Sequence, residues 1–135
     1  MNLSLICVDP IHVPEIWPVV SDRIKEAMRR GDLGSFRGVE LSVYQGNALL
    51  WLVTDGAGIF AAIVTQLEES EWRRICCIVA CGGKGRHKWL HLISKLESYA
   101  RDEGCTAMRI LGRKGWQRVL EDYKPRRVIL EKELH

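Results

Sequence analysis

The segment that most constrains the fold is a short apolar run that ends in glycines and is followed at once by an amphipathic pattern. Residues 74–80 predict a strand buried on both faces, because 75–80 are all apolar and lie between charged residues and glycines. Residues 88–101 predict a helix, because apolar side chains recur three and four residues apart on one face: Trp89, Leu92, Ile93, Leu96, Tyr99 and Ala100. A strand, a glycine loop and a helix are therefore expected in direct succession.

The loop at residues 82–85, Gly-Gly-Lys-Gly, predicts a site for a phosphate or pyrophosphate. Glycines have no Cβ and leave backbone N–H groups accessible, and the start of a helix adds positive potential. Lys84, Arg86 and His87 add donors and positive charge at the same place. The alternative is a strand-to-helix turn that binds nothing, because short glycine motifs often occur without a ligand.

Composition predicts one soluble domain spanning residues 1–135, since 47% of the chain is hydrophobic and no apolar run is long enough for a membrane helix. The five cysteines contain no CxxC pair and are interpreted as buried thiols in a reducing cytoplasm. A zinc site formed by Cys77, Cys81 and His87 is a weak alternative, because this spacing matches no common ligand pattern.

Charge is distributed unevenly along the chain. The formal net charge is +3, but residues 71–135 alone hold 15 Lys and Arg against 8 Asp and Glu, or +7. The half that contains the glycine loop is therefore the basic half. This favours an anionic ligand near the loop: a nucleotide, a phosphate or a nucleic acid.

The remaining segments predict a mixed α/β sheet with helices on its faces. In chain order they are expected to be a strand at 3–8, helices at 14–30 and 36–45, strands at 48–54 and 59–66, a strand at 105–111, a short helix at 112–122 and a final strand at 128–130. A strand, helix and strand between residues 74 and 111 should form a crossover between parallel strands.

This element order and the glycine loop resemble the GNAT acetyltransferase superfamily over nearly the whole chain. The family loop has the pattern Arg/Gln-x-x-Gly-x-Gly/Ala; Gly83 and Gly85 match its small positions, and Ala80 stands at the Arg/Gln position. The resemblance implies a central, mostly antiparallel sheet with helices on both faces and a splayed pair of strands at 75–81 and 106–111. The chain is similar to the small, divergent members of this kind that phages encode.

The resemblance also implies a binding site for acetyl-coenzyme A. The backbone amides of residues 84–87 would bind the pyrophosphate, the pantetheine would lie between the splayed strands, and the acetyl group would lie near Ile78 and Val79. Arg113 or Lys114, which follow the strand at 105–111, would contact a phosphate. The alternative is that they lie at the solvent-exposed start of the next helix. The implied cofactor-binding residues are Ile78, Val79, Gly83, Lys84, Gly85, Arg86, His87 and Arg113.

Catalytic residues are not identified by the sequence. The family often uses a carboxylate near the central strands as base and a tyrosine in the last helix as acid. Residues 75–80 carry no acid, so only the acidic residues at 68, 69 and 71 remain, and these are better interpreted as a solvated loop. Arg118 stands where the acid tyrosine would lie, and Tyr123 is better interpreted as a core anchor.

Three functions stay open. The first is an acetyl-coenzyme A-dependent N-acetyltransferase that acts on an unidentified small-molecule or peptide amine. The second is a GNAT-fold protein without turnover that binds a protein partner, which the departures at Ala80 and Arg118 favour. The third is a nucleic-acid binder, and it is the weakest because the basic residues are scattered and form no recognised motif.

Overall fold

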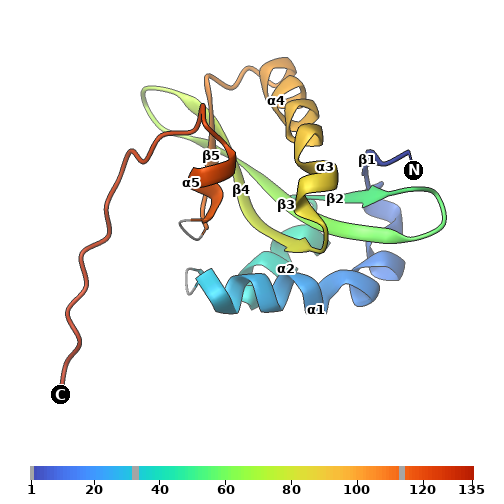
Figure 1. Ribbon diagram of the computed structural model, residues 1–135, viewed down its shortest axis with the longest axis horizontal. Coiled ribbons are helices and arrows are strands. Elements are labelled where there is room, and N and C mark those ends of the chain that lie inside the picture. The colour runs from blue at the N-terminus through green and yellow to red at the C-terminus, as the bar shows by residue number, and fades with distance from the viewer. Residues whose placement is uncertain (1, 32–33, 113–114) are drawn as a thin grey trace.

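The computed structural model describes residues 2–31, 34–112 and 115–135. Its centre is a five-stranded sheet in the order β1-β2-β3-β4-β5 (Figure 1). The first four strands pair antiparallel with one another, and β5 pairs parallel with β4. The strands are β1 (Ser4–Cys7), β2 (Leu49–Thr54), β3 (Ile59–Glu69), β4 (Arg74–Gly83) and β5 (Ala107–Ile110). The mixed, mostly antiparallel sheet expected from the sequence is confirmed.

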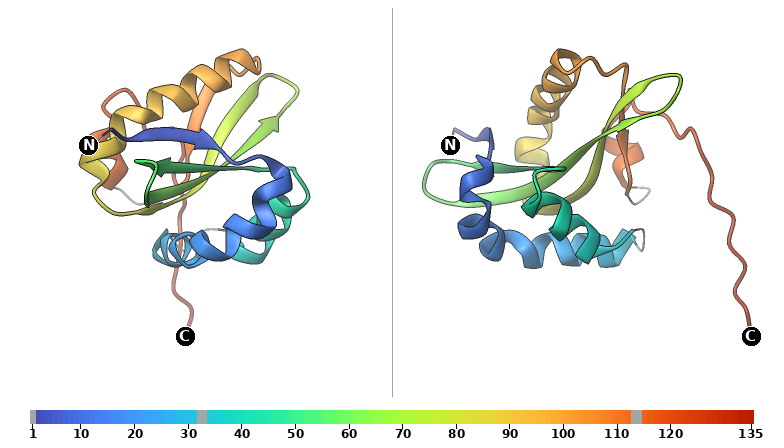
Figure 2. Two further views of the ribbon diagram at one scale, coloured as in Figure 1. Left: turned by 90° about the vertical axis from the view of Figure 1, so that its right-hand side faces the viewer. Right: turned by 180° about the vertical axis from the view of Figure 1, so that it is seen from behind.

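Helices cover both faces of this sheet (Figure 2). One face carries α1 (Val13–Gly31), which follows the short 3-10 turn η1 (Pro10–His12), and α2 (Phe36–Tyr44). The other face carries the helical stretch that follows β4, namely α3 (Arg86–Trp89), the 3-10 turn η2 (Leu90–Leu92) and α4 (Ile93–Asp102). Trp116 of the short α5 (Gly115–Val119) packs against this second core. No helix in the described ranges is both long and apolar enough to cross a bilayer.

Each face has its own hydrophobic core. Trp17, Val20 and Ile24 of α1 lie one helical turn apart and are buried against the sheet. On the opposite face Trp89, Ile93 and Leu96 are buried in the same way. The helical periodicity in the sequence thus identified the buried stripe of both helices.

β4 is longer than expected and includes two of the loop glycines. Gly82 and Gly83 pair with Ala62 and Ala61 of β3, so the strand ends at Gly83. A Cβ on Gly82 would lie 2.2 Å from the carbonyl oxygen of Arg23 in α1, and a Cβ on Gly83 would lie 2.4 Å from the carbonyl oxygen of Phe60. These glycines let α1 and β3 approach the strand closely, which leaves only residues 84 and 85 as the loop.

The end of the chain also differs from the expectation. α5 is shorter than the predicted helix at 112–122, and Arg113 and Lys114 lie outside the described residues. The predicted strand at 128–130 is wrong for the single chain: residues 124–135 have no regular structure and extend away from the body (Figure 1). Val128 and Leu130 are 81% and 90% exposed, because no strand lies beside them to bury them.

Candidate functional site

The site begins where β4 separates from β5. In the ladder with β3, Val64 pairs with Ala80 and Thr65 pairs with Ile78, so Val79 is an extra residue that bulges from the strand. A bulge bends its strand and increases the local twist. On the other side, the pairing of β4 with β5 ends at Ile78, whose carbonyl accepts a hydrogen bond from the Leu111 amide at 3.2 Å. The two strands therefore diverge from Val79 onward, and the expected splayed pair is present.

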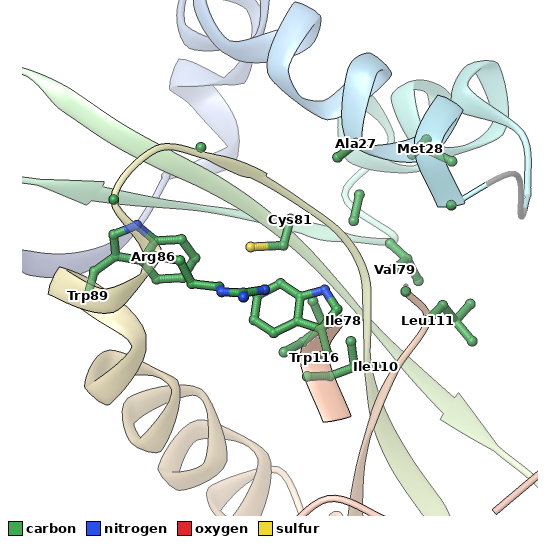
Figure 3. Close-up of a pocket in the computed structure, with 15 residues that line it drawn as sticks. Ala27, Met28, Ile78, Val79, Cys81, Arg86, Trp89, Ile110, Leu111 and Trp116 are labelled. Atoms are coloured by element: carbon green, nitrogen blue, oxygen red, sulfur yellow. The ribbon is translucent and has the colours of Figure 1, made fainter. Parts of the chain in front are cut away.

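A cavity of about 320 Å³ opens at this divergence. Residues from α1, β4, the loop, the end of β5 and α5 line it together, so it reaches both faces of the sheet (Figure 3). The lining residues are Ala27, Met28, Gly31, Ile78, Val79, Ala80, Cys81, Gly83, Gly85, Arg86, Trp89, Ile110, Leu111, Gly112 and Trp116.

The structure brings together most of the residues expected at the cofactor. Ile78, Val79, Gly83, Gly85 and Arg86 all line this cavity. Of the others, Lys84 lines a neighbouring, more open cavity of about 710 Å³, and the exposed His87 lines neither.

The second cavity is markedly basic. Arg23, Arg30, Lys84 and Lys88 line it, against the single carboxylate of Glu26. It shares its border with the first cavity at Ala27, Cys81, Gly83 and Gly85. A ligand that occupied the split between the strands would therefore have positive charge beside it where it leaves the sheet.

A stacked pair closes one side of the first cavity. The guanidinium carbon of Arg86 lies 4.8 Å from the centre of the Trp116 ring (Figure 3). This distance allows a cation–π interaction, which holds the charged group over the ring. Gly112 makes the arrangement sterically feasible, because a Cβ there would lie 2.6 Å from the Trp116 ring. Trp116 thus packs against the second core and also forms part of the cavity wall, a position that the sequence analysis did not predict.

The loop amides are only partly available to a ligand. The Lys84 amide donates to the Phe60 carbonyl at 3.0 Å, which corrects the expectation that it faces an anion. In the described part of the chain, the amides of Gly85, Arg86 and His87 donate to no backbone carbonyl outside their own helix. The Trp89 indole N–H donates to the Lys84 carbonyl at 3.0 Å and fixes the loop on the helix. Three amides at the start of α3 therefore remain, instead of the four expected.

The cavity offers no general base among its described lining residues, which include no carboxylate and no histidine. Cys81 directs its sulfur into the cavity (Figure 3), and burial raises the pKa of this thiol to about 12, against the opposing charge of Arg86. The thiol is therefore protonated near neutral pH and is not an activated nucleophile. In the described ranges, no three His, Cys, Asp or Glu side chains converge to hold a metal ion.

The acidic residues considered as a base lie at the far end of β3 and β4. Glu68 pairs with Arg109 at 3.2 Å, and Glu69 pairs with Arg74 at 3.4 Å. Glu68 is level with Ile75, at the other end of β4 from the glycines that border the cavity. The sequence predicted that Glu68 lies in a solvated loop. In the structure Glu68 lies in β3 and forms an ion pair with Arg109 of β5, which the sequence alone does not indicate.

Tyr123 is a structural residue. Its ring packs in the second core, and its hydroxyl donates to Glu97 Oε2 at 2.7 Å. Burial and the hydrogen bond to this carboxylate both raise the pKa of the phenol. Arg118, at the position of the expected acid, is exposed.

Several solved structures with this architecture are named acetyltransferases. A GCN5-related N-acetyltransferase from Ralstonia eutropha superposes with a TM-score of 0.70 at 10% identity, over 98% of this chain and 99% of that one. The chain has the GNAT fold. A predicted acetyltransferase from Clostridium acetobutylicum, solved with acetyl-coenzyme A, matches this GNAT-fold chain with a TM-score of 0.66 at 10% identity, over 99% of this chain and 96% of that one.

A third structure of the same fold is an aminoglycoside acetyltransferase from an uncultured soil metagenomic sample, in complex with sisomicin. It has a TM-score of 0.66 and 12% identity, and the match covers 98% of this chain and 97% of that one. No protein-family model matches the sequence, and no curated protein is significantly similar to it. The GNAT fold implied by the resemblance is thus present in a sequence that shares only 10–12% identity with these three structures. The similarity to phage-encoded members stays a prediction.

Proposed function

We propose that this GNAT-fold chain binds acetyl-coenzyme A and transfers its acetyl group to an amine. The observation that carries the proposal is the divergence of β4 from β5 at the Val79 bulge, with a cavity of about 320 Å³ at that point. Within the described residues, the backbone of β4 beyond Ile78 has no ladder partner on the side of β5. These unpaired groups suit the amide groups of an extended pantetheine, which would pair with them as an added strand does.

The same backbone provides a place for the reacting thioester. An N–H group of β4 near Val79 would donate to the thioester carbonyl and stabilise the negative charge that develops on its oxygen. In the reaction the amine nitrogen bonds to the carbonyl carbon, the carbon–sulfur bond breaks, and coenzyme A leaves as a thiol. The chain would contribute orientation of the two reactants, because residues of α1, β4, the end of β5 and α5 surround the split between the strands.

The phosphates would lie at the start of α3. The amides of Gly85, Arg86 and His87, which donate to no described backbone carbonyl outside their own helix, and the charge of Arg86 suit a pyrophosphate. Lys84 and Lys88, beside the second cavity, would add positive charge where the ligand leaves the protein. Arg113 lies outside the described residues and stays a predicted contact of a phosphate.

The absence of a base from the described cavity wall has a kinetic consequence. The attacking amine must lose its proton to water, so the rate should rise with pH until the amine is neutral. The acceptor is an amine of unidentified structure. The aminoglycoside acetyltransferase of the same fold was solved in complex with sisomicin, which supports a small-molecule amine as the first class to assay.

Calorimetry with coenzyme A and with acetyl-coenzyme A tests binding, and mass spectrometric detection of acetylated amines tests transfer. Mass detection is preferable to thiol reagents, because Cys7 is an exposed thiol of the protein itself. No binding of either compound at millimolar concentration would sink the proposal. Binding without transfer to any amine would favour the GNAT-fold interaction module, and salt-dependent DNA binding without coenzyme A binding would favour the nucleic-acid function.

A further inference from the structure

The second cavity carries positive charge that the pyrophosphate does not account for. Among the described residues, four basic side chains and one carboxylate line it, which gives a net charge of +3. The pyrophosphate of the proposed cofactor would lie at the start of α3 beside Arg86, which lines the first cavity and not the second. Like charges that gather in one cavity repel each other and attract an anionic ligand. The charge on the α1 side of this cavity therefore has no function yet.

Two arginines of α1 form one wall of the cavity. Arg23, Ala27 and Arg30 lie on the same flank of the helix, four and three residues apart, so a small side chain separates the two guanidinium groups. The Cα atoms of the two arginines are about 10 Å apart along the helix axis. Ala27 also lines the first cavity (Figure 3), so this flank reaches the place where the two cavities join.

Both arginines have donors left for a ligand. Arg23 is half-buried, and its Nη1 donates to the Ile59 carbonyl at 2.8 Å, which fixes the side chain beside the start of β3. Among the described residues, no carboxylate forms an ion pair with it. Arg30 donates to Glu26 Oε1 through Nε at 3.0 Å, and the same oxygen lies 2.7 Å from Arg29. One carboxylate thus serves two arginines, and the terminal nitrogens of Arg30 can donate to another acceptor.

Two lysines form the wall on the side of the loop. The Lys84 amide is fixed by the Phe60 carbonyl at 3.0 Å, and the Lys84 side chain is exposed. Lys88 lies one helical turn later, and its Cδ is 3.6 Å from the position of a Cβ on Gly85, so its stem lies over the loop. An anion in the cavity would therefore meet guanidinium donors from α1 and ammonium donors from the loop and α3.

We propose that the second cavity binds a phosphomonoester group. Such a group carries close to two negative charges at neutral pH, and its three terminal oxygens accept hydrogen bonds from several donors at once. The planar fork of a guanidinium matches these oxygens in pairs. A carboxylate, with one charge and two oxygens, would offset less of the net charge of +3.

The phosphomonoester can come from two sources. Coenzyme A carries one on its ribose, in addition to its pyrophosphate, and this source rests on the proposed function. The other source is a separate phosphorylated compound, which does not depend on acetyl transfer. The cavity volume of about 710 Å³ leaves room for more than the phosphate itself.

Calorimetry on the full chain with coenzyme A and with dephospho-coenzyme A, which lacks this phosphate, tests the first source. Arg30→Gln should weaken coenzyme A binding about tenfold, and the loss should vanish with dephospho-coenzyme A, because the contacted group is then absent. Lys88→Gln should act in the same direction. Arg29→Gln is the matched control, because Arg29 is exposed and pairs with the same Glu26 but does not line the cavity.

An NMR titration of the full chain with inorganic phosphate tests the second source. The side-chain Nε–H signals of Arg23 and Arg30 should shift together. In Arg30→Gln, the Arg23 signal should need about ten times more phosphate for the same shift, and in Arg29→Gln it should respond as in wild type. If coenzyme A and dephospho-coenzyme A bind wild type alike while phosphate shifts these signals, the cavity takes a separate phosphorylated ligand.

Failure of this site and failure of the proposed function give different results. If neither coenzyme A compound binds but phosphate still shifts the two arginine signals, acetyl transfer is contradicted and the phosphate site holds. The phosphate site is overturned when phosphate shifts neither signal and Arg30→Gln affects the two coenzyme A compounds equally. Binding of coenzyme A in that case leaves acetyl transfer intact, and the arginines of α1 then serve the fold alone.

Discussion

Gly82→Ala tests whether the glycines at the end of β4 serve packing or a ligand. In the wild-type protein the position of the new Cβ lies 2.2 Å from the carbonyl oxygen of Arg23 and 2.7 Å from its carbonyl carbon. Both are backbone atoms of α1, so no side-chain rotation relieves the clash. To restore an ordinary contact distance, α1 and β4 must separate by about 1 Å.

The cost of that separation follows from what lies between the two elements. Val20 and Ile24 of α1 are fully buried against this face of the sheet, and a gap of this size forfeits a quarter to a half of each van der Waals contact. Overpacking of a core typically costs about 1–3 kcal/mol, and a backbone clash belongs at the upper end of this range. We expect a loss of about 3 kcal/mol in the free energy of unfolding, or roughly 10 °C in Tm.

Urea denaturation of matched glycine variants measures this loss. Gly58→Ala is the control: no atom lies within 4 Å of its Cβ and its φ is not in the left-handed region, so it should be neutral or slightly stabilising. Gly85→Ala is the intermediate case, because Gly85 has a φ of 65° but its Cβ meets only Lys88 at 3.6 Å; it should cost about 1–2 kcal/mol. If Gly82→Ala is as stable as Gly58→Ala, the packing explanation for the motif is wrong.

Three further predictions follow from the site. Arg86→Ala should weaken coenzyme A binding about tenfold in calorimetry, while Lys95→Ala, an exposed cation outside the cavity, should bind like wild type; equal effects would contradict the assigned site. Tyr123→Phe should lower the free energy of unfolding by about 1 kcal/mol, because Glu97 loses its donor, and should leave any transfer rate unchanged; a lost rate would make Tyr123 catalytic. Burial raises the pKa of Cys81 from 9.0 to about 12, so the folded state keeps a proton that the unfolded state loses, and stability should fall as pH rises from about 9 toward 12. Cys81→Ala should flatten this fall in a series of urea titrations, and an unchanged pH profile would count against the buried thiol.

The sequence predicted those parts of the fold that depend on local periodicity. The buried stripes of α1 and α4 follow from apolar residues at helical spacing. The helix expected at 36–45 is also present as α2, and Ser35 caps it with a hydroxyl that accepts from the Gly38 amide at 3.1 Å. The hairpin of β2 and β3 matches the two strands expected at 48–54 and 59–66. In each case the signal lies within a few neighbouring residues, so a single sequence is sufficient to predict the element.

The parts that failed depend on partners distant in sequence. The strand predicted at 128–130 from its apolar residues is wrong, because a strand also needs a neighbour and the described part of the chain supplies none there. In the same way, the stacking of Arg86 on Trp116 joins residues thirty positions apart, and neither residue carries a local signal of it. Composition and spacing indicate that such side chains are present but not what they contact.

The glycine motif borders the cavity, but its glycines have a different role from the one that the sequence suggested. Its glycines were interpreted as a phosphate cradle, yet Gly82 and Gly83 belong to a paired strand and are required by the close approach of Arg23 and Phe60. The cavity exists because Val79 has no partner in β3. The bulge at this residue bends β4 away from β5. A substitution such as Gly83→Asp would therefore disturb β3 and β4 before it reached a ligand. The informative variants are those at Arg86 and Gly85, whose side-chain positions border the cavity without supporting the sheet.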